Sequence, residues 1–67
     1  MLHEICKDYR KDTGTKQHEL GNVKNISAFE NGRSSNINYL QLYLDLAKNR
    51  NELDELLKRI KEGVNNG

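Results

Sequence analysis

The chain contains no proline and no tryptophan, and it has a single cysteine among its 67 residues. Because Cys6 is alone, an internal disulfide is excluded, and no cluster of His or Cys surrounds it at the spacing of a metal site. The apolar stretches are far shorter than the roughly 20 residues that a membrane-spanning helix requires, and no signal-peptide pattern begins the chain. We therefore expect a reduced, cytoplasmic protein with no metal, no cofactor and no membrane partner.

The chain also has little excess of charge of either sign, because 11 Lys and Arg residues nearly balance 10 Asp and Glu residues and leave a net charge of +1. A nucleic-acid-binding protein usually carries a basic stripe, so the total charge does not by itself favour such a partner. Binding depends more on where the cations lie than on their sum. A chain this short forms one small domain at most and buries only about 60% of its unfolded surface, which makes dimerisation a natural source of stability.

Apolar residues recur at intervals of three and four, which is the period of an amphipathic helix, whereas no segment alternates in the manner of a strand. Turn-forming residues separate the segments at Gly14, Gly21–Asn22, 32–36 and 49–51. The pattern predicts an all-α domain over residues 1–64, followed by a frayed tail at 65–67. Its five helical segments are expected at about 2–12, 16–20, 23–31, 37–48 and 52–64.

Local signals predict the ends and faces of these segments. Thr15 is a candidate N-cap of the second segment and Asn22 of the third, because short polar side chains accept hydrogen bonds from the first backbone N–H groups of a helix. Gly21 is free to adopt the left-handed cap conformation. The fourth segment carries an apolar stripe wide enough for contacts on two sides. This stripe comprises Ile37, Tyr39, Leu40, Leu42, Tyr43, Leu44, Leu46 and Ala47.

Two stretches match, in order, the halves of one motif. Residues 10–21 read Arg-Lys-Asp-Thr-Gly-Thr-Lys-Gln-His-Glu-Leu-Gly, and residues 25–33 read Asn-Ile-Ser-Ala-Phe-Glu-Asn-Gly-Arg. The first resembles Arg-Lys-x-x-Gly-x-Thr-Gln-x-Glu-Leu-Ala, the front half of the helix-turn-helix in regulators of the phage repressor and Cro type, also called XRE-like. The second resembles the recognition helix of the same family, and the resemblance covers about residues 2–57.

The resemblance implies a compact five-helix domain whose helix at about 23–31 enters the major groove of DNA. The chain departs from the family between these halves. Only four residues lie between Gly21 and Ile26, which is fewer than family members have, so the second helix and the turn are shortened.

By matched position, the resemblance assigns contacts to the bases and phosphates of DNA. Lysine can donate to guanine, asparagine can pair with adenine, and alanine offers a methyl contact to thymine. The expected base contacts are Lys24, Asn25, Ser27 and Ala28. The expected phosphate contacts are Gln17, Asn31, Arg33 and Asn36. From the residues alone, Lys24 could equally be a solvated lysine and Asn25 a capping residue.

Arg10 and Glu30 match a family pair that links the first helix to the end of the recognition helix through a charge-assisted contact. The residues alone leave open two surface charges of little energetic weight. Part of the apolar face of the last segment must be core packing. The fourth and last segments together are expected to form a homodimer, since helix-turn-helix proteins pair to meet two half-sites. The residues of that interface are Leu53, Leu56, Leu57 and Ile60.

No nucleophile motif, phosphate loop or carboxylate pair indicates an enzyme. The sequence thus favours a sequence-specific, repressor-like transcriptional regulator of phage or mobile-element type that binds operator DNA. The alternative is a small phage-encoded inhibitor that uses the same scaffold to bind a protein, such as a repressor, a polymerase subunit or a CRISPR nuclease. Tyr39, Leu42 and Leu46 are the candidates for an apolar patch that would bind such a protein.

Overall fold

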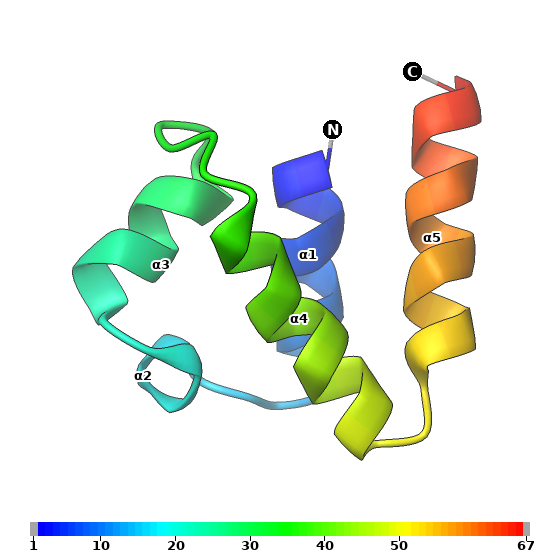
Figure 1. Cartoon of the computed structure of the whole chain (residues 1–67), viewed down its shortest axis with the longest axis horizontal. Coiled ribbons are helices and arrows are strands. Elements are labelled where there is room, and N and C mark those ends of the chain that lie inside the picture. The colour runs from blue at the N-terminus through cyan, green and yellow to red at the C-terminus, as the bar shows by residue number, and fades with distance from the viewer. Residues whose placement is uncertain (1, 67) are drawn as a thin grey trace.

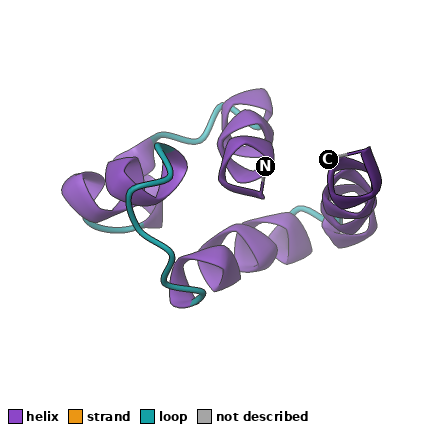
Figure 2. Ribbon diagram, turned by 90° about the horizontal axis from the view of Figure 1, so that it is seen from above, coloured by secondary structure: helices purple, strands orange, loops and turns teal. Residues whose placement is uncertain are grey.

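The computed structural model describes residues 2–66, and residues 64–66 are described by their backbone alone. Within these residues the chain forms five helices and no strand, so the all-α prediction is confirmed. The helices are α1 (Leu2–Asp12), α2 (Gln17–Leu20), α3 (Val23–Glu30), α4 (Asn38–Asn49) and α5 (Leu53–Asn66). Figure 1 shows α2 and α3 at one end and α5 at the other, and Figure 2 shows α1 and α4 between them.

Three helices end in the same hydrogen-bonded motif. The residue after the C-cap has a left-handed backbone in each, with φ of 75° at Gly14, 76° at Gly32 and 58° at Asn51. The next residue's N–H then donates to the carbonyl five positions earlier, at 3.3 Å after α1, 2.8 Å after α3 and 2.7 Å after α4. This is the Schellman pattern, which glycine and asparagine tolerate best. The turn signals at these positions are confirmed.

The beginning of α2 differs from the prediction. Its N-cap is Lys16, whose backbone N–H donates to Glu19 Oε2 at 2.6 Å, and not Thr15, whose carbonyl instead accepts from Arg10 Nη1 at 2.9 Å. Gly21 does not form a left-handed cap either, because its φ of 158° and ψ of −151° describe extended backbone. The Thr15 prediction was wrong because the Glu19 side chain closes a capping box on Lys16. The Gly21 prediction was wrong because the chain leaves α2 in an extended conformation.

Asparagines open the next two helices. Asn22 caps α3 as predicted, with its Oδ1 accepting from the backbone N–H groups of Lys24 at 3.0 Å and Asn25 at 3.4 Å. Before α4, Asn36 Oδ1 accepts from the Asn38 N–H at 2.9 Å. Ile37 was predicted to lie on the apolar face of α4, but it precedes the helix and is 66% exposed. This prediction was wrong because the helix begins one residue later than its apolar pattern.

The last helix continues to Asn66 and so covers part of the predicted tail. Gly67 lies outside the described residues, as do the side chains of 64–66. Near its end α5 closely approaches α1, since a Cβ built at Gly63 would overlap Ile5 Cδ1. A residue without a side chain permits this approach.

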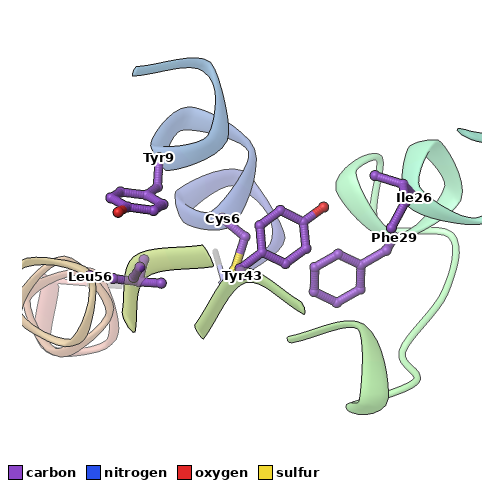
Figure 3. Packing of buried hydrophobic residues seen from close by; sticks show 7 residues of the cluster. Cys6, Tyr9, Ile26, Phe29, Tyr43 and Leu56 are labelled. Carbon is purple, nitrogen blue, oxygen red and sulfur yellow. The ribbon is translucent and has the colours of Figure 1, made fainter. Parts of the chain in front are cut away.

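The core draws on α1, α3, α4 and α5. Tyr43 lies between Cys6 and Phe29 in Figure 3, and the rings of Phe29 and Tyr43 are 5.5 Å apart. Burial, followed by the nearby charge of Glu30, raises the pKa of the Cys6 thiol to about 12, so it is a packing residue and not a nucleophile. The buried apolar residues are Cys6, Tyr9, Ile26, Phe29, Tyr43, Ala47 and Leu56.

Candidate nucleic-acid interface

Glu30, the last residue of α3, is 2% exposed and lies where four helices meet. From α1, Arg10 donates from Nε to Oε2 at 2.6 Å and from Nη2 to Oε1 at 2.9 Å. Gln17 Nε2 of α2 donates to Oε1 at 3.0 Å, and the Tyr43 hydroxyl of α4 donates to Oε2 at 2.7 Å. The predicted pairing of Arg10 with Glu30 therefore exists as a buried, bidentate contact, and two independent surface charges are excluded.

The electrostatics of this cluster keep Glu30 ionised. Burial acts to raise the pKa of its carboxyl, but the hydrogen bonds from Arg10, Gln17 and Tyr43 together outweigh burial and hold the pKa below its ordinary value. Burial and then the Glu30 carboxylate raise the pKa of Tyr43, so its hydroxyl stays protonated and donates. Because Arg10 compensates the charge of Glu30 internally, the carboxylate adds no negative charge to the surface of α3.

Gln17 has an interior partner that the sequence did not predict. The resemblance placed this residue against a phosphate, whereas its amide donates inward to Glu30. The bond ties α2 to the C-terminal end of α3, while Gly21 and Asn22 alone connect the two helices at their other ends. The short connection and this bond therefore hold α2 and α3 together as one unit.

The exposed side of α3 carries no acid and is polar except for Val23. Ile26, Phe29 and Glu30 face the interior, whereas Lys24 and Asn25 are exposed. The cap of this helix is Asn22, so Asn25 is not the capping residue that the sequence left open. The two remaining predicted base contacts, Ser27 and Ala28, are partly buried.

Residues 20–44, which include α3, carry a positive exposed charge, although the chain as a whole is nearly neutral. From residue 20 to residue 44 the only acidic residue is Glu30, which is buried. The exposed cations in that range are Lys24 and Arg33. Arg10, Arg50 and Arg59 each pair with a carboxylate, while no ion pair among the described side chains includes Arg33.

The remaining predicted phosphate contacts lie on the segment that joins α3 to α4. Arg33 is exposed one residue after the left-handed Gly32. Asn31 is exposed and its amide donates to Ser27 Oγ at 3.2 Å, so these two side chains form one polar surface along α3. Asn36 is exposed as well, with its amide oxygen already accepting from the start of α4. All three can be reached from solvent.

Two lysines of α1 border this surface and were not predicted to take part in it. Lys7 and Lys11 line a polar groove between α1 and the end of α3, together with Asn31. Glu4, Asp8 and Glu30 line the same groove, so the acids there balance the two lysines. The sequence alone assigned no role to Lys7 or Lys11. Their spacing of four residues placed them on one stripe, but only the packing of α1 on α3 brings that stripe beside Asn31.

The predicted dimer residues divide into buried and exposed side chains. Leu56 has 0% exposure and lies in the core, so its assignment to a dimer interface was wrong. Leu57 is 47% exposed, and Leu53 and Ile60 are partly buried against the core. The exposed apolar surface of α5 is therefore narrower than the sequence predicted.

The apolar patch predicted for protein binding, made of Tyr39, Leu42 and Leu46, does not form one exposed surface. Tyr39 packs on Phe29 with ring centres 5.9 Å apart. Leu42 and Leu46 are partly buried and, with Leu20, line a shallow depression between α2 and α4. The rim of this depression includes Glu19, Asp45 and Asn49.

Three further findings bear on function. Within residues 2–66 no group of three or more His, Cys, Asp or Glu side chains is placed to hold a metal ion. None of the described helices combines the length and apolarity needed to cross a bilayer. No protein-family model, no curated protein and no solved structure matches the chain.

Proposed function

We propose that this protein is a sequence-specific DNA-binding transcriptional regulator of the helix-turn-helix type, repressor-like and of phage or mobile-element origin, and not an enzyme. In this proposal α2 crosses the DNA backbone and α3 lies in the major groove. The observation that carries the proposal is the division of α3 into two faces. Ile26, Phe29 and Glu30 anchor the helix, while its outer side presents Lys24 and Asn25 with no exposed acid on the helix itself.

The chemistry of each side chain suits a distinct part of DNA. Lys24 can donate to guanine O6 and N7, and the Asn25 amide can pair with adenine N6 and N7. Ser27 and Ala28 complete the base-reading surface. Phosphates are contacted by side chains at its border, which add affinity but no sequence preference. In our proposal these are Asn31, Arg33 and Asn36, with Lys7 and Lys11 added from α1.

A second copy would give the protein a two-fold site. We propose that α5 supplies the contact through Leu57, with the exposed parts of Leu53 and Ile60 beside it. Replacing Leu57 by lysine should shift the protein toward the monomer in sedimentation experiments and weaken binding to a paired site more than to a half-site. Monomeric wild-type protein at the concentrations where DNA is bound would contradict the dimer.

Selection from random duplex DNA, followed by fluorescence anisotropy at several salt concentrations, tests the main proposal. Arg33→Ala should weaken binding to all sequences and reduce the salt slope by about 1, whereas Lys24→Ala should relax one position of the site by about 1–3 kcal/mol. Lys58→Ala is the matched control, because Lys58 is exposed on α5 away from α3. If the wild type shows no salt-dependent binding at low ionic strength, the proposal fails.

A protein-binding inhibitor is the second candidate, and one observation favours it. The depression lined by Leu20, Leu42 and Leu46 has an acidic rim at Glu19 and Asp45, which suits a partner with apolar and basic side chains. Leu42→Lys should abolish binding to such a partner and leave the DNA affinity unchanged. If Leu42→Lys weakened DNA binding and left binding to such a partner unchanged, this candidate function would be ruled out.

A further inference from the structure

Val23 is a large apolar side chain that is about half exposed. It is the first residue of α3 and is 47% exposed, although Ile26 and Phe29 of the same helix are buried. Its neighbours Asn22 and Lys24 are exposed and polar. Because the end of a recognition helix that contacts base edges is its N-terminal end, Val23 stands where a base contact would be made.

The outer side of α3 offers a limited set of chemical groups. Lys24 brings a donor, Asn25 brings an amide, and Val23 and Ala28 bring methyl groups. Carboxylates, which accept from the amino group of cytosine, are absent from this side, since Glu30 is buried. In the major groove the only methyl group of an unmodified base pair is the C5-methyl group of thymine. The apolar part of this surface therefore has one natural counterpart in DNA.

The position of Val23 is well defined before any DNA binds. The Asn22 side chain bonds the N–H groups of Lys24 and Asn25 and so fixes the first turn of α3 around it. A β-branched side chain in a helix has one strongly preferred χ1 rotamer, so little conformational freedom is lost when it makes contact. Such a side chain can therefore contact a base without first losing conformational freedom, so less of the binding free energy is spent on ordering it.

We propose that Val23 contacts the methyl group of a thymine in the preferred DNA site and thereby selects thymine at that position. The proposal rests on the DNA-binding function proposed above and adds a determinant of specificity to it. Loss of one buried methyl group weakens binding by about fourfold, on the scale of apolar transfer. The thymine preference due to Val23 is confined to one position of each half-site, because a single side chain contacts a single base pair.

The test replaces each thymine of the selected site, one at a time, by deoxyuridine, which lacks only the methyl group. We expect wild-type affinity to fall about fourfold at one thymine per half-site and to be unchanged elsewhere. Val23→Ala should remove this difference, so that thymine and uracil are bound equally at that position, and Val23→Ile should restore it. Thermal unfolding of both variants checks that the fold is intact.

The outcomes separate the inference from the function on which it rests. If the wild type binds no duplex at low salt, the DNA-binding proposal itself fails. If it binds a defined site but no thymine is sensitive to loss of its methyl group, only the role of Val23 fails. That role also fails if the sensitivity persists in Val23→Ala, and loss of the sensitivity in Ala28→Gly would then assign the methyl contact to Ala28.

Discussion

Two clusters, each with a glutamate that accepts from an arginine and a tyrosine, hold the domain together, and they differ in burial. Glu30 binds Arg10 and the Tyr43 hydroxyl, and its side chain is 1% exposed. Glu52 binds Arg50 at 2.8 Å and the Tyr9 hydroxyl at 2.9 Å, but its side chain is 41% exposed. The first cluster joins four helices around the proposed reading head, whereas the second attaches the start of α5. The same kinds of hydrogen bond should stabilise the fold very differently in these two places, because solvent screens the second.

The largest effect is expected from Arg10→Ala. This change leaves the buried Glu30 carboxylate without its compensating charge and should lower the free energy of unfolding by about 3–5 kcal/mol. That loss is comparable to the whole stability of so small a domain. Urea denaturation followed by circular dichroism measures it.

A second variant keeps the test meaningful if Arg10→Ala does not fold. Replacing the pair together, as Arg10→Met with Glu30→Leu, removes both charges and should recover part of the stability, because Tyr43 and Gln17 still lose their acceptor. If Arg10→Ala were as stable as the wild type, the Arg10–Glu30 pair would not contribute to the free energy of unfolding as expected.

Acid should weaken the interior cluster next. The unfolded Glu30 carboxyl titrates near about pH 4.3, and its folded pKa lies lower, so its stabilisation is complete above that pH and is lost as the pH falls through the folded pKa. The pKa of Glu52 is also lowered, by Arg50 and then by Tyr9, so it contributes with the same sign. Unfolding free energies measured from pH 7 to pH 3 should therefore fall on the acid side.

The Arg10→Met, Glu30→Leu variant isolates the contribution of Glu30 to that acid sensitivity. Its stability should decline less steeply below about pH 4.3 than that of the wild type. An identical decline in both proteins would show that other carboxyl groups, and not Glu30, are responsible.

The same substitution in both tyrosines compares the clusters directly. Tyr43→Phe removes a hydrogen bond to a buried carboxylate and should destabilise the fold by about 1.5–3 kcal/mol. Tyr9→Phe removes the equivalent bond to the half-exposed Glu52, where water can replace the hydroxyl, and should cost less. Thermal unfolding of the two variants under one set of conditions decides the order, and a larger loss for Tyr9→Phe would reverse the comparison.

The smallest effect is expected from Arg50→Ala. Its ion pair with Glu52 is exposed on both sides, and such pairs contribute little to stability. The unfolding midpoint should be unchanged within error, and added salt should not alter the difference between variant and wild type. A clear loss of stability would mean that α5 depends on this contact more than its exposure indicates.

The helices of this protein were predictable because their signals are local. The Gly14, Gly32 and Asn51 ends follow from a left-handed residue that bonds the preceding turn, and the Asn22 cap acts on the two N–H groups that follow it. The errors arose where the local signals were ambiguous. Both Thr15 and Lys16 could begin α2, and the apolar stripe of α4 extended one residue too far, to Ile37.

The candidate site was only partly predictable. The inward positions of Ile26 and Phe29 follow from spacing, and so does the exposure of Lys24 on another side of α3. The resemblance supplied the pairing of Arg10 with Glu30, which composition and spacing left open. Neither source revealed the inward bond of Gln17 or the approach of Lys7 to Asn31, because these depend on how α1 and α2 pack against α3.

The sequence by itself determined the five helices, most of their ends and the apolar face of each, because these depend on residues within about one turn of one another. Tertiary structure decided which apolar residues are buried, placing Leu56 in the core and leaving Leu57 and Val23 exposed. It also decided that the Glu30 carboxylate is buried and that Arg10 compensates its charge. Burial and pairing of this kind require groups that are far apart along the chain to meet, and no local pattern encodes that meeting.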